Sequence, residues 1–442
     1  MFTNDQDTIF AQSSGLGKAA IALFRLSGPA CFEVLEALCS GAQLPIGRVA
    51  LRTVRHPLSH DPIDRALITR FEAPASFTGE DLAEISVTGG RAVTAALAEA
   101  LASMPGLRAA EPGEFTWRAF SNGKIDLSEV EGLADLIEAE TEAQRRQAQR
   151  IAGGALRREC EEIRSILIAA MAAVETQIDF SDVEDVHDLT LETAKRALHQ
   201  ALARIDRALA GALAGHRVRE GFVIVIAGPP NVGKSTLLNA LVGRDVAITS
   251  PFAGTTRDAI EIFLDLGGYP VILVDTAGIR VAEDPIEREG VERAKRHAKN
   301  ADLTLWLDDK RDSDTPALAG EALFIRTKID QPGTRTTVLR GAELAISAKT
   351  GEGIDDLLKA IRSRAEEQMG AFEPPILTLD RHRRAFQEAR SSLASALKSS
   401  ACECELLAED IRRATAALDL IIGRIGVEEV LGEIFSRLCV GK

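Results

Sequence analysis

Aromatic residues are scarce in this sequence, where they make up 4% of the residues and include a single tyrosine. Long apolar runs are missing too, because no stretch approaches the roughly 18 apolar residues that a membrane-spanning helix needs. The first ten residues include acidic side chains and no apolar core, which argues against a signal peptide. We therefore expect a cytoplasmic protein without membrane contact.

Cysteines are few and show no paired spacing. The six stand at positions 31, 39, 160, 402, 404 and 439, which does not resemble a disulfide framework and predicts reduced thiols. Cys402 and Cys404 could form half of a metal site, but no histidine or further cysteine lies nearby to complete it. Two thiols on an ordinary helix are the favoured interpretation.

Positive charge is in deficit, with 52 basic against 66 acidic residues and a net charge of -14. Such a chain does not coat nucleic acid by bulk attraction, so any contact with nucleic acid needs a local basic patch. Local arginine clusters occur at 145, 146 and 150, at 157 and 158, and at 381, 383 and 384. Solvated helix faces are the commoner explanation of such clusters.

At 442 residues, the chain is long enough for two to four domains, and its texture changes three times. Residues 1–120 mix short strand-like runs with Gly and Pro, which predicts an α+β domain. Residues 121–215 and 371–442 show apolar residues at steps of three and four, which predicts long amphipathic helices. Residues 216–370 alternate buried strands with helical segments, as α/β domains do.

The apolar stripes of the first helical region need a partner surface. They comprise positions 156, 160, 163, 167, 171, 174 and 178, then 191, 194, 198, 202, 205, 209 and 213. Because the last region carries a similar stripe, we favour one helical bundle with the α/β block inserted into it. Two separate helical domains are the alternative.

The α/β block contains a phosphate-binding loop, GPPNVGKS at 228–235, which fits the pattern G-x-x-x-x-G-K-[ST]. A buried strand precedes it and an apolar helix follows, as the motif requires. Its glycines let backbone N–H groups converge on phosphates at a helix N-terminus. Lys234 is expected to contact the outer phosphates and to act in catalysis, and Ser235 to bind Mg²⁺.

Four further motifs follow in the order typical of a Ras-like GTPase. GTTRD (254–258) offers Thr256 as a second Mg²⁺ ligand, and DTAG (275–278) ends a strand. TKID (327–330) places Asp330 to accept hydrogen bonds from guanine, and SAK (347–349) closes the base pocket. The sequence therefore predicts GTP binding by residues Asn231, Val232, Gly233, Lys234, Ser235, Thr236, Ser250, Phe252, Ala253, Gly254, Thr255, Thr256, Asp275, Thr276, Ala277, Gly278, Thr327, Lys328, Asp330, Ser347, Ala348 and Lys349.

Three departures from the usual G-domain pattern matter. Thr327 replaces an Asn whose amide braces the loop, although guanine preference should survive. The connection between the strands near 303–307 and 323–326 is too short for a full helix. Ile279 stands where Ras-like enzymes have the Gln that orients the attacking water. Glu287 is the best acidic candidate for that task, and a solvent-facing Glu at a helix start is the alternative.

Four further motifs lie outside the G domain: SFTGED (76–81), PGEF (112–115), NGKIDL (122–127) and the terminal CVGK (439–442). Together with the G motifs they form a pattern that resembles the MnmE/TrmE family of bacterial tRNA-modification GTPases. The resemblance covers nearly the whole chain. It implies a homodimer whose N-terminal domain binds a tetrahydrofolate derivative, 5-formyl or 5,10-methylene, as one-carbon donor. The matching residues are Arg25, Glu84, Lys124 and Lys442.

The resemblance also implies a partner protein of the MnmG type that uses FAD, a heterotetramer with it, and modification at C5 of the wobble uridine of certain tRNAs. Hydrolysis in the family depends on K⁺, which would fall on Asn231, Ser250, Phe252 and Thr255, and Glu287 matches the water-positioning Glu. Cys439 is either a reactive, catalytic thiol or a small apolar helix residue. Because CVGK extends past the last amphipathic helix, we expect it to bury little.

Two other classes of GTPase fit the sequence less well. A ribosome-assembly switch of the Era or Der type has similar G motifs, but it predicts an RNA-binding module with a GXXG loop, and nothing after residue 375 matches one. A membrane-remodelling GTPase needs an exposed apolar or strongly basic tip, which the sequence lacks. A GTPase that modifies tRNA is the favoured hypothesis.

Overall fold

The structure is a computed structural model that describes residues 7–41, 44–179, 184–229, 231–244, 246–248, 261–275, 301–309, 320–331, 344–370, 374–398, 404–424 and 441. The chain divides into two compact units, one made of residues 1–134 and 419–442 and the other of residues 135–418. The domain boundaries predicted at 120, 215 and 370 stay predictions.

The first unit contains a six-stranded sheet in the order β3-β4-β5-β2-β1-β6. Neighbouring strands are antiparallel except for β1 and β6. The elements are β1 (Thr8–Gln12), β2 (Ile21–Ser27), α1 (Cys31–Leu38), β3 (Ala50–Arg55), β4 (Pro62–Phe71), β5 (Leu82–Thr88), α2 (Arg91–Ala102), β6 (Leu107–Ala109), α3 (Glu114–Ser121) and α4 (Leu127–Glu138).

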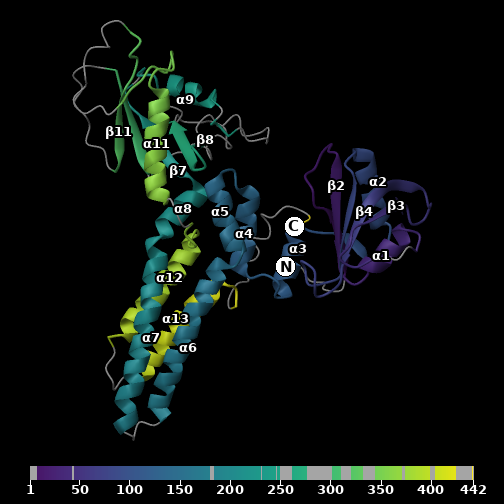
Figure 1. Ribbon diagram of the computed structural model, residues 1–442, viewed down its shortest axis with the longest axis horizontal. Helices are drawn as coiled ribbons and strands as arrows, with labels where there is room; N and C mark the ends of the chain where they lie inside the picture. The colour runs from purple at the N-terminus through teal and green to yellow at the C-terminus, as the bar shows by residue number, and fades with distance from the viewer. Residues whose placement is uncertain are drawn as a thin grey trace, which may run out of the picture. The chain divides into compact units, whose positions relative to one another are not determined.

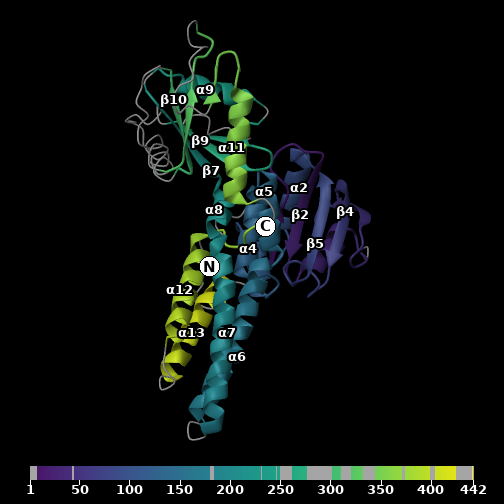
Figure 2. The same cartoon turned by 60° about the vertical axis from the view of Figure 1, so that its left-hand side comes forward.

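Only one face of this sheet carries the main core of the unit. Phe24 and Ile85 point from the strands into a buried cluster with Leu35 of α1 and Leu97 of α2, and Figure 2 shows α2 beside the sheet. Side chains alternate between the two faces of a strand, so the residues between these positions lie on the opposite face. That second face holds the charged residues discussed below.

In the second unit, helices that precede and follow the α/β block in the sequence form one bundle. They are α5 (Glu142–Ala152), α6 (Ala155–Asp179), α7 (Glu184–Ala210), α8 (Ala212–Glu220), α12 (Asp380–Ala396) and α13 (Cys404–Ile421). Arg390 of α12 lies 2.5 Å from Asp206 of α7, and Arg412 of α13 lies 4.0 Å from Glu175 of α6. Figures 1 and 2 show α12 and α13 alongside α6 and α7. The single-bundle interpretation is therefore confirmed.

The buried stripe of this bundle differs from the predicted one. In α6 the buried positions are 156, 160, 163, 167, 170, 174 and 177, and in α7 they are 191, 194, 198, 201 and 205. Two expected core residues, Ile178 and Leu213, are exposed by 38% and 59%. The prediction was wrong there because the buried residues recur every 3.5 positions, as in a coiled coil. Small residues such as Ala170 and Ala201 then face inward.

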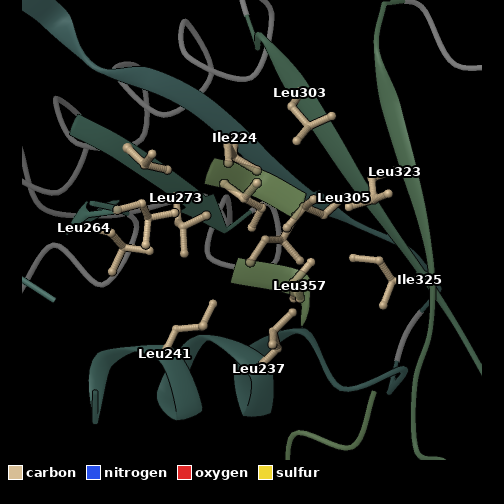
Figure 3. Close-up of a cluster of buried hydrophobic side chains, with 14 of the residues drawn as sticks. Ile224, Leu237, Leu241, Leu264, Leu273, Leu303, Leu305, Leu323, Ile325 and Leu357 are labelled. Atoms are coloured by element: carbon tan, nitrogen blue, oxygen red, sulfur yellow. The ribbon is translucent and has the colours of Figure 1, made fainter. Parts of the chain in front are cut away.

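Between α8 and α12 lies the α/β block. Its sheet has the order β12-β11-β10-β7-β9-β8, parallel except for the β8–β9 pair. The elements are β7 (Phe222–Ala227), α9 (Lys234–Val242), β8 (Glu261–Asp265), β9 (Pro270–Asp275), β10 (Leu303–Asp308), β11 (Ala322–Arg326), β12 (Leu344–Ala345) and α11 (Ile354–Met369). Leu237 and Leu241 of α9 and Leu357 of α11 pack against strand residues such as Leu273 (Figure 3).

Helix α5 binds both connections between the bundle and the α/β block. Gln147 is 3% exposed, and its amide donates hydrogen bonds to the carbonyls of Gly215 and Pro375, at 3.2 and 3.3 Å. Gly215 leads into the block and Pro375 leads out of it. A Cβ atom on Gly215 would lie 2.3 Å from the Leu377 carbonyl oxygen, so this close approach requires glycine.

These features confirm the predicted fold class, an N-terminal α+β domain and a Ras-like domain inserted in a helical bundle. None of the described helices combines the length and the hydropathy of a membrane span. Cys31, Cys39, Cys160 and Cys404 are free thiols. Within the described ranges, no cluster of three or more His, Cys, Asp or Glu residues is suited to hold a metal. Cys402 and residues 310–319, the predicted short connection, lie outside these ranges.

Candidate functional site

The predicted nucleotide motifs meet at one edge of the second sheet. Strands β7, β9, β11 and β12 run parallel, so their carboxyl ends lie at the same edge, where open α/β sheets bind ligands. The loop 228–235 follows β7, and the motifs TKID and SAK follow β11 and β12. Asp275 is the last residue of β9, and its backbone pairs in register with Ile226 of β7. The structure thus brings together the phosphate-binding loop, TKID, SAK and the first residue of DTAG, Asp275.

Two glycines shape the phosphate-binding loop. Gly228 has a φ of 144°, and a Cβ atom there would lie 2.3 Å from the carbonyl oxygen of Leu307. Gly233 has a φ of 109° and is the N-cap of α9. Both conformations are disfavoured for other residues. The loop therefore turns sharply before α9, whose first backbone N–H groups form the kind of helix start that can bind an anion.

Lys234 is held over this loop by two backbone carbonyls. Its Nζ atom donates hydrogen bonds to the oxygens of Gly228, at 2.8 Å, and Pro229, at 2.9 Å. An ammonium group has three N–H donors, so one is left for a phosphate oxygen. Ser235 and Thr236, in the first turn of α9, are exposed. The loop fits a nucleotide phosphate, and Ser235 can offer its hydroxyl to Mg²⁺.

Thr327 braces the loop in place of the usual Asn. The residue is 4% exposed, and its hydroxyl donates to the carbonyl of Val232 at 2.8 Å and lies 3.4 Å from that of Asp308. Its backbone N–H also donates to the Asp308 carbonyl at 2.9 Å. A single hydroxyl thus ties the end of β11 to the phosphate-binding loop. The sequence indicated that a bracing amide was lost but did not reveal this replacement.

Asp330 and Ser347, which the sequence predicts to recognise the base, are in direct contact. The Ser347 hydroxyl is fully buried and donates to Oδ1 of Asp330 at 2.7 Å. This hydrogen bond, with the nearby charge of Lys349 as a smaller influence, lowers the pKa of Asp330. The carboxylate is oriented and ionised, which suits an acceptor for the two N–H groups on guanine.

Lys328 of the TKID motif links the phosphate-binding loop to the segment that follows β10. It has a φ of 58°, and its Nζ atom donates to the carbonyl of Asn231 and to Oδ2 of Asp309, each at 2.6 Å. The backbone of Asn231 is also left-handed, with a φ of 64°. Asn231 and Lys349 are exposed, Val232 is buried and Ala348 is half-buried.

Several predicted site residues lie outside the described ranges. They are Ser250, Phe252, Ala253, Gly254, Thr255, Thr256, Thr276, Ala277, Gly278, Glu287, Cys439 and Lys442.

A second charged cluster lies on the first unit's sheet, on the face away from α1 and α2. Arg25 of β2 and Glu84 of β5 are register neighbours, and the guanidinium donates to Oε1 of Glu84 at 2.8 and 3.2 Å. The rings of Phe77 and Phe115 have their centroids 5.5 and 5.9 Å from the Arg25 guanidinium carbon. Aromatic faces attract a guanidinium at such distances. Arg25 is thus held from two directions.

Lys124 anchors the loop that carries Phe77. Its Nζ atom donates to the carbonyl of Pro74 at 2.9 Å. A Cβ atom on Gly79 would lie 3.2 Å from the aliphatic chain of Lys124, so the two segments are closely packed. Three of the four residues that the resemblance assigns to a folate site are therefore described, and Arg25 and Glu84 are in direct contact.

Gly441, the one described residue of the C-terminal motif, packs against the end of β1. Gly441 is buried, its carbonyl accepts a hydrogen bond from the Ser13 hydroxyl at 2.8 Å, and its φ is 95°. A Cβ atom there would lie 2.7 Å from the Gln12 carbonyl oxygen. The expectation that the last four residues bury little was wrong for this glycine, because backbone packing leaves no apolar signal in the sequence.

A buried ion network went unnoticed in the sequence. Arg118 is 2% exposed and donates to Oε2 of Glu80, at 3.0 Å, and to Oε1 of Glu114, at 3.2 Å. Arg108 also donates to Glu114, at 2.5 and 2.8 Å. Burial alone would raise the pKa of Glu114, but the hydrogen bonds from Arg108 and from the Glu111 N–H outweigh it and lower that pKa. The motifs SFTGED and PGEF were the available signal.

Comparison with known proteins matches two family models to this chain. The model described as the GTP-binding protein TrmE N-terminus matches residues 8–124, and the MnmE helical domain matches residues 127–439, more than half of the chain. This chain belongs to the MnmE family. Among curated relatives, the tRNA modification GTPase MnmE of Rhodopseudomonas palustris (strain ATCC BAA-98 / CGA009) is 47% identical over 100% of both chains. That of Methylobacterium sp. (strain 4-46) is 48% identical over 99% of this chain and 100% of its own.

Among solved structures, the G domain of the T. maritima FeoB iron transporter matches 33% of this chain and 98% of its own length. The sequence identity is 20% and the TM-score is 0.21. So low a score adds no weight to the assignment. The two family models and the full-length relatives decide it, and this MnmE-family chain is accordingly a GTPase.

Proposed function

We propose that this MnmE-family chain couples GTP hydrolysis to the modification of certain tRNAs at C5 of the wobble uridine. An FAD-dependent protein of the MnmG type is the proposed partner in a heterotetramer, and a tetrahydrofolate derivative is the proposed one-carbon donor. The observation that carries this proposal is the full-length match to relatives named tRNA modification GTPase MnmE. The two sites described above supply its chemistry.

In hydrolysis, water attacks the γ-phosphate of GTP, and GDP and phosphate leave. The remaining N–H donor of Lys234 and the start of α9 stabilise negative charge on the phosphates. Mg²⁺, held by Ser235 and Thr256, would neutralise further charge. We assign the orientation of the water to Glu287, because Ile279 cannot do so.

We propose that K⁺ takes the place of an arginine finger in a dimer of G domains. Asn231, Ser250, Phe252 and Thr255 would coordinate the ion. Asn231 supports this assignment, because its side chain is exposed on a left-handed turn of the phosphate-binding loop. If the assignment holds, replacing K⁺ by Na⁺ slows GTP hydrolysis, and Glu287→Ala slows it about 100-fold with little change in GTP affinity. Equal rates in K⁺ and Na⁺ contradict the cation mechanism.

A row of leucines interrupted by one serine, with Leu51 and Leu67 exposed, supports the proposed homodimer. Leu51, Leu67, Ser86 and Leu23 lie side by side across β3, β4, β5 and β2, on the sheet face away from α1 and α2. Leu51 and Leu67 are each 48% exposed, and Ile21 beside them is 63% exposed. Contiguous apolar surface of this kind marks interaction sites.

Arg25, Lys124 and Lys442 carry positive charge that suits the carboxylates on a folate glutamate tail, and Glu84 can accept from the donors on the pterin. A catalytic role for Cys439 is proposed with them. We place this activity in the cytoplasm.

The test is mass analysis of tRNA nucleosides from a strain that lacks this chain and is complemented with variants. We expect wild type to restore the wobble-uridine modification and Lys234→Ala to fail, because GTP hydrolysis is lost. Arg25→Ala should also fail while its purified protein hydrolyses GTP at the wild-type rate. Unchanged nucleosides in the deletion strain would contradict the proposed function.

A further inference from the structure

The loop 76–80 is fastened to the rest of the first unit by hydrogen bonds that converge on Glu80. The Ser27 hydroxyl donates to Oε2 of Glu80 and lies 2.7 Å from the Thr78 hydroxyl. Arg118 approaches the same carboxylate oxygen from α3, at 3.0 Å. The Ser76 hydroxyl donates to the Glu80 carbonyl at 2.5 Å. One acidic side chain thus ties the loop to β2 and to α3.

The groups that contact the Glu80 carboxylate are buried, and this restricts where the carboxylate can lie. Ser27 and Thr78 are fully buried and Arg118 is 2% exposed, whereas the Glu80 side chain is 20% exposed. A buried guanidinium needs a nearby carboxylate, because an uncompensated charge in such surroundings is costly. Glu114 supplies a second carboxylate and is itself held by Arg108. The network therefore tolerates few other positions for Glu80.

Phe77 lies between Ser76 and Thr78, which the hydrogen bonds around Glu80 hold in place, and its ring contacts Arg25. It packs against the buried cluster of Ile9, Ala11 and Phe115, and its ring lies 5.5 Å from the Arg25 guanidinium carbon. Glu84 holds the other side of the same guanidinium. The position of the loop thus bears directly on how Arg25 is presented.

We propose that Glu80 is a positioning residue of the one-carbon donor site. It does not bind the donor; through Ser27, Thr78 and Arg118 it holds the loop so that Phe77 keeps the Arg25 guanidinium aimed at a carboxylate of the ligand. This inference rests on the proposed folate binding. The substrate class it concerns is a reduced folate with a glutamate tail.

The experiment is calorimetric titration of the full-length protein with 5-formyltetrahydrofolate. Glu80→Gln keeps the shape of the side chain and removes its charge, and we expect affinity to fall about tenfold, the order of coupling between contacting residues. Leu97→Ala is the matched control, because this fully buried residue packs under the opposite face of the same sheet. It should lower the melting temperature at least as much and leave affinity within about twofold.

A double-variant cycle separates positioning from general destabilisation. If Glu80 acts through Arg25, Glu80→Gln loses its effect in the background of Arg25→Gln, which itself weakens binding. Equal losses in Glu80→Gln and Leu97→Ala, or an undiminished effect of Glu80→Gln in the Arg25→Gln background, overturn the inference and leave the folate site standing. Absence of binding to wild type overturns both.

Discussion

Thr327 offers the sharpest test of how the nucleotide site is assembled. The change Thr327→Val keeps the volume of the side chain and removes only the hydroxyl that reaches the Val232 carbonyl at 2.8 Å. Loss of a buried hydrogen bond costs about 1 kcal/mol, and the unpaired carbonyl raises the cost toward about 2 kcal/mol. Because Val232 belongs to the phosphate-binding loop, we expect most of this cost in nucleotide affinity, about a fivefold to thirtyfold increase in the Kd for GDP and GTP.

The measurement is equilibrium titration with a fluorescent guanine nucleotide. Thr327→Ser is the matched control, since it keeps the hydroxyl and deletes a methyl group, and its Kd should stay within about threefold of wild type. Discrimination against adenine nucleotides should be unchanged in both variants, because base recognition is assigned to Asp330, which both variants keep. A Thr327→Val protein that binds GDP as tightly as wild type would refute the view that this hydroxyl braces the loop.

Three further predictions concern other parts of the chain. Asp330→Asn should weaken GTP binding by about 2 kcal/mol and improve binding of xanthosine triphosphate, which a competition titration measures; unchanged GTP affinity would contradict the role of Asp330. The lowered pKa of Glu114 means that its contribution to stability is present above the ordinary glutamate pKa and is lost as pH falls through the folded-state value. Denaturant unfolding between pH 7 and pH 3 should therefore show less acid destabilisation in Glu114→Gln than in wild type, and parallel pH profiles would disprove this. Gly441→Ala forces a Cβ atom against Gln12 at positive φ, so tRNA modification should fall while the GTPase rate holds, and equal loss of both would indicate a general folding defect.

The nucleotide motifs could be predicted from the sequence because their chemistry is local. A loop of eight residues between a strand and a helix is recognisable by its own residues, and the order of the strands then brings Asp330 and Ser347 to the same edge. Such signals need no knowledge of distant contacts. The hydrogen bond by which Thr327 braces the loop could not be predicted, because its acceptor, the Val232 carbonyl, lies 95 positions away in the sequence.

The packing of the bundle and the contacts of the first unit could not be predicted from residue spacing alone. The bundle prediction favoured the larger side chains Ile178 and Leu213, whereas closely packed helices place alanines inward. The Glu80 and Arg118 contact joins residues 38 positions apart in a network whose members each resemble an ordinary surface charge. Gly441 has no side chain to signal burial. In each case the deciding contact is between elements that only the fold brings together.

The hydrogen bonds from α5 to both connections have a consequence for how this architecture can be rearranged. The chain passes into the α/β block through α8, which contains Gly215, and leaves the block at Pro375, and Gln147 binds the carbonyls of both residues. To the bundle, the whole block is equivalent to a single surface loop with adjacent ends, and closing such a loop costs little more when it is long than when it is short. Blocks of different length or sequence can therefore be exchanged at this point without altering the path of α7 and α12. New termini opened within the block would likewise leave both connections hydrogen-bonded to Gln147 of α5.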